Sequence, residues 1–177
     1  KSFFLDVNFA SNIPSLSPII DLDRKSVIAF TNRLNNIDSS SDVFPTTDFV
    51  SAEASSGDSN EAIYVTRKVS LDNPASALKV IVDINRLASA DVQLMFKILR
   101  SDDASDFDEL GYNFFNTAGE SDNTVTPSST LDDFKEYEFT ANNLDEFIAF
   151  SIKIRMQGTN SSEPPRLKDL RVIALAT

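Results

Sequence analysis

Four aspartates stand close together in the second half of the chain and could supply oxygen ligands to a metal ion. They are Asp102, Asp103, Asp106 and Asp108. Calcium takes several such hard ligands, so this run is a candidate calcium site. The spacing does not match an EF-hand loop, because Leu110 and Gly111 fall at the wrong places. We therefore favour a structural interpretation, in which Ser105 or Asp106 caps one short helical turn, and we assign no metal. Asp21 and Asp23 are a second, less specific calcium candidate.

Two glutamates, Glu136 and Glu138, could form the carboxylate pair that glycoside cleavage requires. They stand two residues apart in a stretch with strand periodicity, so their side chains share one face. A glycosidase also needs a carbohydrate cleft, commonly lined by aromatic rings, and the chain has no Trp. We interpret the pair as a solvated strand face.

The chain contains no Cys and no His. Disulfides, zinc sites built on these residues, and Ser–His–Asp or Cys–His nucleophilic mechanisms are therefore excluded. With four Gly, the chain also lacks the glycine-rich motifs that cradle phosphates. We expect no enzymatic activity and assign no catalytic or cofactor-binding residue.

The net charge of −11 is unevenly distributed along the chain. Residues 38–61 contain six acidic side chains and residues 101–133 contain nine, with no Lys or Arg in either stretch. Phosphate contacts need clustered Lys and Arg, so we expect no binding to nucleic acid. No stretch is long and apolar enough to cross a bilayer, so we expect no membrane insertion. The acidic stretches are typical of segments that keep a protein soluble.

The stretch from residue 147 to 156 alternates with period two, which is typical of a strand. Its even positions are apolar: Ile148, Phe150, Ile152, Ile154 and Met156. The positions between them are Ala149, Ser151, Lys153 and Arg155. We expect a central strand of an antiparallel sheet, with the first set in the core and the charged face in contact with water.

Other stretches show the same alternation and no amphipathic helix is evident. The further strands are expected at residues 3–9, 26–34, 63–71, 78–85, 92–98, 112–115, 134–140 and 170–176. A short link suggests that 78–85 and 92–98 form a hairpin, and residues 72–75 have turn chemistry. Residues 35–61 and 101–133 are expected to be long acidic loops. The pattern predicts an all-β antiparallel β-sandwich and favours a jelly roll.

The sandwich is expected to be a single domain spanning residues 1–177. Because the chain begins at Lys1 rather than Met, we expect its first residues to continue a longer protein or to follow a removed tag or segment. Four basic residues near the end of the chain, Arg155, Arg166, Lys168 and Arg171, are expected to be exposed. They could pair with acidic loops of a neighbouring copy or be ordinary surface.

Several segments together resemble a known family. They include SPIIDLDR (17–24), NRLNN (32–36), IYVTRKV (63–69), residues 78–86 and 92–99, SDD (101–103), FKEY (134–137), residues 150–155 and PRLKDLRVIAL (165–175). This series resembles a domain found near the end of virion structural proteins of T4-like tailed phages, particularly marine cyanophages. The resemblance spans nearly the whole chain, and it is carried by strand and turn signatures rather than by catalytic motifs.

The resemblance implies a non-enzymatic component of the tail or baseplate of a phage particle, made in the host cytoplasm and located in the virion. Such a domain acts through assembly contacts with other virion proteins or with its own copies. In the family it follows a longer N-terminal part, so the resemblance implies that this chain is the C-terminal part of a longer protein. We assign no cofactor. The alternative is a carbohydrate-binding β-sandwich module for attachment to a host-surface glycan. That alternative predicts a concave face or loop cluster carrying Tyr112, Phe114 or Phe115 with Asp and Asn nearby.

Overall fold

The computed structural model describes residues 62–176, 34–37 and 47–48, together with residues 8, 10, 12 and 19. The chain divides into two units, Lys1–Phe30 and Thr31–Thr177, and the described strands belong to the second. The strands expected at 3–9 and 26–34, apart from Asn8 and Leu34, lie outside the described residues. So do Asp21, Asp23 and most of the acidic stretch 38–61.

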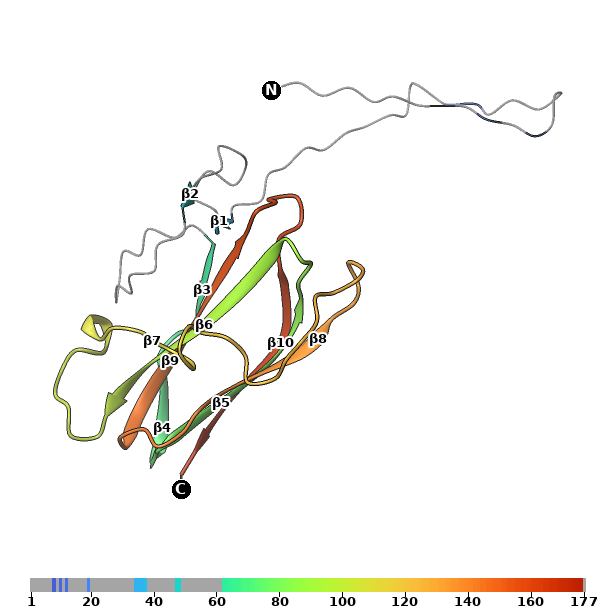
Figure 1. The fold of residues 1–177 in the computed structure, drawn as a ribbon. Coiled ribbons are helices and arrows are strands. Elements are labelled where there is room, and N and C mark those ends of the chain that lie inside the picture. The colour runs from blue at the N-terminus through green and yellow to red at the C-terminus, as the bar shows by residue number, and fades with distance from the viewer. Residues whose placement is uncertain are drawn as a thin grey trace. The chain divides into compact units, whose positions relative to one another are not determined.

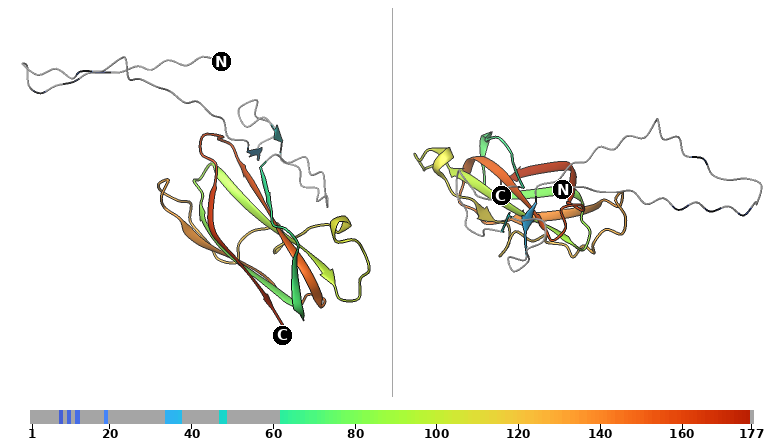
Figure 2. Two further views of the ribbon diagram at one scale, coloured as in Figure 1. Left: turned by 180° about the vertical axis from the view of Figure 1, so that it is seen from behind. Right: turned by 90° about the horizontal axis from the view of Figure 1, so that it is seen from above.

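The described strands form two sheets, which face each other in Figures 1 and 2. The seven-stranded sheet contains β1 (Asn35–Asn36), β2 (Thr47–Asp48), β3 (Ile63–Val65), β4 (Val69–Ala75), β6 (Ala90–Arg100), β7 (Asn113–Phe114) and β9 (Phe147–Gly158). The three-stranded sheet has the order β10 (Arg166–Leu175), β5 (Ala77–Asn85), β8 (Lys135–Ala141). A 3-10 turn, η2 (Phe107–Glu109), is the only helical element among the described residues.

The core lies between the two sheets. One face of β5, from Leu78 to Ile84, packs against the inward residues of β6, β8 and β9. The core also contains a group of rings formed by Phe96, Phe115 and Phe139. Tyr137 and Phe139 point inward from β8, as their alternation predicts. The predicted all-β sandwich is confirmed, and the jelly-roll strand order stays a prediction.

Strand β9 is the centre of the larger sheet. Strand β6 pairs antiparallel along its length on one edge. On the other edge β4, β3 and β1 pair with successive parts of it, and β1 runs parallel. One twelve-residue strand therefore holds four others in place.

The expected hairpin of residues 78–85 and 92–98 is wrong. Strand β5 pairs with β10 and β8, whereas β6 pairs with β9 and β7, so residues 86–89 carry the chain from one sheet to the other. Alternation shows that each strand has a buried face, but it does not identify the neighbouring strand. The expected turn at 72–75 is also wrong, because β4 continues to Ala75.

The expected inward face of β9 is confirmed at Phe150, Ile152 and Ile154. The prediction that Ile148 also points into the core is wrong. Ile148 is 37% exposed, whereas Phe147 is fully buried. The register explains the exchange: Leu99 pairs with Ala149 and Arg100 pairs with Phe147, which leaves Ile148 without a partner on β6. Such a bulge reverses the alternation at the start of the strand. At the other end Met156 is half-buried.

The expectation that the second face of β9 meets water is wrong. Ser151, Lys153 and Arg155 have exposed fractions of 1%, 2% and 0%, and Lys97 of the neighbouring β6 has 4%. Arg155 therefore does not belong to the exposed basic cluster that was expected near the end of the chain. In contrast, Arg166, Lys168 and Arg171 are exposed, as expected.

Aromatic rings from the connection that follows β6 pack against these buried cations. The Lys97 Nζ lies 4.5 Å from the centre of the Phe107 ring and 5.1 Å from that of Tyr112. The Lys153 Nζ lies 5.0 Å from the Tyr112 ring, and the Arg155 guanidinium lies 5.5 Å from the Phe114 ring. Ring faces attract cations that have lost part of their water, so the connection and the sheet stabilise each other.

Hydrogen bonds reinforce this contact. The Lys97 Nζ donates to the Phe107 carbonyl at 2.9 Å, and the hydroxyls of Tyr112 and Ser151 are 3.1 Å apart. Burial lowers the pKa of the Lys97 ammonium, against the opposing fields of Asp108 and Asp106.

Substitutions on the two sides of the β9 bulge test the packing. Ile152→Ala should lower the free energy of unfolding by about 2–5 kcal/mol, because it removes a fully buried side chain and leaves a cavity. Ile148→Ala should cost less than about 1 kcal/mol, because that side chain is already partly hydrated. Urea denaturation measures both values. Equal losses would contradict the bulge.

A glycine pair tests how the connection between β6 and β8 docks. Gly119 has φ of +76° and its amide and carbonyl bond to Phe115 and Leu94. A Cβ there would lie 2.8 Å from the Leu94 carbonyl oxygen, whereas nothing lies within 4 Å of one at Gly111. In urea unfolding, Gly119→Ala should destabilise by more than about 1 kcal/mol, and Gly111→Ala should not. A harmless Gly119→Ala would show that the connection is not docked in this way.

Candidate functional site

A polar pocket of the sandwich opens where β5 ends, β6 begins and the connection from 116 to 134 crosses β8. Its volume is about 320 Å³. The lining residues are Arg86, Asp91, Val92, Glu120, Ser121, Asn123, Thr124, Val125, Tyr137 and Phe139. Polar side chains thus surround an apolar floor formed by Val92, Val125 and Phe139.

Arg86 is the best-anchored group of the pocket. Its Nε donates to the Tyr137 hydroxyl at 3.2 Å, and its Nη1 donates to the Ala90 carbonyl at 3.3 Å and to Asp91 Oδ1 at 3.1 Å. Gln157 Nε2 donates to the other oxygen of Asp91 at 3.4 Å. The guanidinium and the carboxylate are therefore fixed side by side at the pocket wall.

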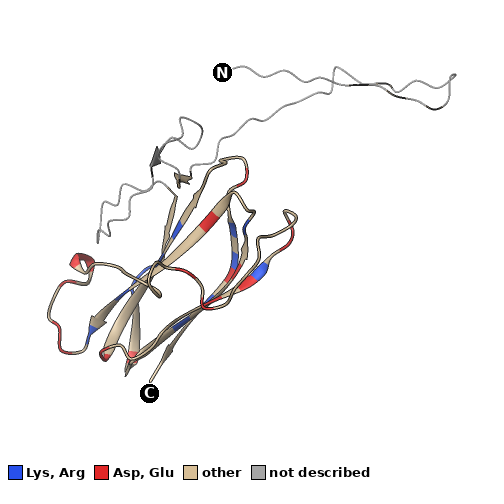
Figure 3. Ribbon diagram, in the orientation of Figure 1, with Lys and Arg blue, Asp and Glu red and all other residues tan. Residues whose placement is uncertain are grey.

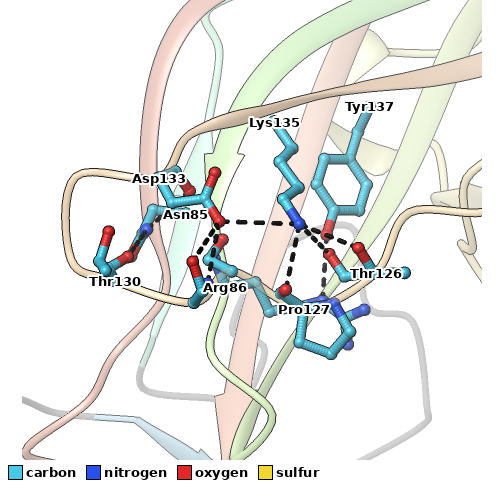
Figure 4. Close-up of polar contacts among 10 residues, drawn as sticks. Asn85, Arg86, Thr126, Pro127, Thr130, Asp133, Lys135 and Tyr137 are labelled. Carbon is cyan, nitrogen blue, oxygen red and sulfur yellow. Dashed lines mark hydrogen bonds and ion pairs between the residues drawn. The ribbon is translucent and has the colours of Figure 1, made fainter.

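A network of side chain to backbone bonds holds residues 126–133 beside the pocket (Figure 4). Asn85 Nδ2 donates to the carbonyls of Thr130 and Asp133, at 2.7 and 2.8 Å. Lys135 Nζ donates to the carbonyls of Thr126 and Pro127, both at 3.1 Å. Figure 4 also shows the bond between Arg86 and Tyr137 at the base of this network. An otherwise irregular segment is thereby fixed to β5 and β8.

The segment that lines the pocket, residues 120–125, is fixed in the same way. Asn123 donates through Nδ2 to the Glu136 carbonyl at 3.0 Å and accepts from the Glu138 amide at 3.0 Å. Asn116 Nδ2 donates to the Glu120 carbonyl and to Asp122 Oδ1, at 2.7 and 3.0 Å. The lining segment and its neighbour 126–133 are therefore both ordered by the protein's own bonds.

The four aspartates of the calcium candidate have separate roles. Arg100 bonds to both oxygens of Asp102, at 2.9 and 2.7 Å, and holds the pKa of that carboxyl below its usual range. Asp103 accepts from Ser105, whose hydrogen bonds lower the pKa of Asp103. Asp106 is the N-cap of η2 and accepts from the Asp108 amide, which confirms the predicted cap. Among the described residues no three carboxylates gather around one point.

The other candidate residues lie outside the pocket's interior. Glu136 pairs with Arg171 at 2.8 Å and Glu138 pairs with Lys79 at 2.8 Å, both on the outer face of the smaller sheet. Tyr112 and Phe115 are buried, with exposed fractions of 7% and 0%, and Phe114 is half-buried over Arg155. These rings therefore do not form the concave face or loop cluster that the carbohydrate-binding alternative predicts at these residues.

Sequence reasoning missed Arg86, Asp91 and Asn123. Arg86 directly follows a buried strand and Asp91 is the second residue of the next one. The available signal was therefore a charged residue near each end of a short link. Asn123 lies in a stretch without periodicity, and its pairing with β8 has no local signature.

Comparisons with models of known families, with curated proteins and with solved structures find no match for this chain. The described residues include no helix long and apolar enough to span a bilayer. The fold and the pocket are therefore interpreted from the chain's own residues.

A pH dependence of the segment 126–133, beside the pocket, follows from Asp133. Hydrogen bonds from Ser129 and the nearby Lys135 hold the pKa of the Asp133 carboxyl below its usual range. Its stabilising contribution is therefore present above pH about 4 and is lost as the pH falls through the depressed pKa. We expect Asp133→Asn to speed amide exchange at residues 128–133 at neutral pH, and this difference from the parent should vanish in acid.

Hydrogen exchange with mass spectrometry at several pH values, corrected for intrinsic exchange rates, measures this effect. Asp132→Asn, next to it in the chain, is the matched control. The Asp132 side chain is exposed, and the bond that this residue makes in the segment, from the Phe134 amide to the Asp132 carbonyl at 3.1 Å, uses the backbone, which the substitution keeps. Equal protection in both variants at neutral pH would contradict the assignment.

Proposed function

We propose that this chain is a non-enzymatic structural domain of a phage virion, in the tail or baseplate region, and that it acts through protein–protein contacts. The resemblance of its strand and turn segments to such virion proteins supports this class. The single observation that carries the contact role is the side of the sandwich between β3 and β10, where an apolar groove adjoins an edge strand.

The groove has a volume of about 420 Å³ and lies between the two sheets. Ile154 and Met156 line it from β9, and Leu167 and Leu170 line it from β10. Tyr64 of β3 stands at its border with 49% of its surface exposed. Apolar surface open to water favours burial by a partner.

Strand β10 offers a template for pairing. It is the terminal strand of the smaller sheet, and among the described residues β5 is its only paired strand. Ile173 and Leu175 are more than two-fifths exposed on its outer face. The bulge between Lys168 and Arg171, with Asp169 at φ of +53°, bends the strand and limits how far a partner strand can extend.

The charges near β10 favour a partner with an acidic surface. Arg166 and Lys168 are exposed on β10, whereas the connection 101–133 carries nine acidic and no basic side chains. Figure 3 shows the acidic residues along that connection. Acidic connections of neighbouring copies, or acidic surfaces of other virion proteins, complement the basic edge.

The test is to measure association at low and at high salt by sedimentation velocity, for the chain alone and with the structural proteins of dissociated particles. We expect association that weakens as salt screens the charges. Lys168→Glu and Ile173→Asp should each weaken it at least about tenfold, a loss of about 1.4 kcal/mol.

Arg67→Glu is the matched control for the charge reversal, because Arg67 is exposed outside β10. It should leave association unchanged. A chain that remains monomeric under all conditions and binds no virion protein would overturn the proposal.

A further inference from the structure

We propose that the pocket beside Arg86 binds one residue of a neutral saccharide, recognised through the paired guanidinium and carboxylate of Arg86 and Asp91. This inference does not rest on the assembly role. The pocket lies against β8 and the apolar groove lies against β10, which are opposite edges of the three-stranded sheet. A partner at one edge therefore leaves the other open.

The first argument is that the binding groups are ordered before any ligand arrives. The bonds to Tyr137, Ala90 and Asp91 use Nε and Nη1 of Arg86, which leaves its Nη2 for a ligand. Asn123 is fixed by two bonds to the β8 backbone. Binding then costs little side-chain entropy, which matters most for small, weakly bound ligands.

The second argument is the pairing of donors with acceptors. Each sugar hydroxyl both donates and accepts, and adjacent hydroxyls need both kinds of partner close together. The Arg86 guanidinium donates and the Asp91 carboxylate accepts, and the two are in contact at 3.1 Å. The Thr124 hydroxyl adds a group that can do either, and the Ser121 hydroxyl, which donates to the Asn123 carbonyl at 2.8 Å, can still accept.

The third argument is charge, which selects among polar ligands. Asp91 and Glu120 outnumber the single cation Arg86 in the lining, so an anionic ligand meets net repulsion. A cationic ligand would compete with Arg86 for Asp91. A neutral ring with hydroxyls around its edge and C–H groups on its face matches both the polar walls and the floor of Val92, Val125 and Phe139.

The experiment is a titration of the chain by heteronuclear NMR. The probes are the methyl glycosides of glucose, galactose, mannose and N-acetylglucosamine, with N-acetylneuraminic acid as the anionic probe. At least one neutral glycoside should shift the amides of residues 86–92, 120–125 and 137–139, with a dissociation constant of about 1 mM or tighter. N-acetylneuraminic acid should bind more weakly than that glycoside.

Two variants make the test specific. Thr124→Trp, on an exposed rim position, should block the pocket and abolish the shifts. Asp91→Asn should weaken binding at least about tenfold, or about 1.4 kcal/mol. Asp72→Asn, exposed on β4 away from the pocket, is the control and should bind as the parent does.

Unchanged β9 amides in each variant show that the sandwich is intact. If Asp91→Asn disturbs them, Thr124→Trp alone decides. Three results would overturn the proposal: no shift with any neutral glycoside, shifts that Thr124→Trp does not remove, or tighter binding of the anionic probe.

Discussion

The constraint on which the rest of the structure depends is the burial of β9 on both faces. Its inner face, Phe150 to Ile154, joins the core between the sheets, and its outer face is covered as well. The charged side chains on the outer face of β9 are therefore not in contact with water. The cations of Lys153 and Arg155, and that of Lys97 on the neighbouring β6, instead contact the rings of Tyr112, Phe114 and Phe107. Desolvated charge is costly, so such contacts must be well ordered to offset the cost.

This constraint explains the long connection between β6 and β8. Its first part supplies the rings that cover the outer face of the larger sheet. Phe115 then turns into the core, and Gly119 bonds to Leu94 of β6. Its last part is tied to β5 and β8 by Asn85, Asn123 and Lys135. An acidic segment without periodicity is therefore a structural component that covers one sheet and forms the walls of the pocket.

The sequence predicts individual strands well because a buried face leaves a periodic trace. Leu170, Val172 and Ala174 alternate along β10 and pack against the core, and Asp106 caps η2 because capping depends on local chemistry. Strand partners leave no such trace, which is why β5 and β6 were wrongly paired. The burial of Arg155 was missed for the same reason: a Lys or Arg alternating with apolar residues indicates a wet face unless rings from a distant segment cover it.

The pocket could not be predicted from the sequence for a related reason. Arg86, Asp91 and Asn123 come from a strand end, a strand start and an irregular connection. Only the crossing of the chain between sheets brings them together. Tyr112 and Phe115, the aromatic residues considered for carbohydrate binding, are buried in the interior instead. Polar residues in linkers were the better guide to the site, but their spacing alone does not reveal which of them meet.

Lysine accessibility tests the two-sided burial of β9 most directly. The native chain would be treated briefly with an amine-acylating reagent and the modified positions quantified by mass spectrometry, with the urea-unfolded chain as reference. The account predicts strong protection of Lys97 and Lys153, which are 4% and 2% exposed, and ready modification of Lys168, whose side chain is 48% exposed. Modification of Lys97 and Lys153 at the rate of Lys168 in the native chain would contradict it, because the outer face of the larger sheet would then be open to water.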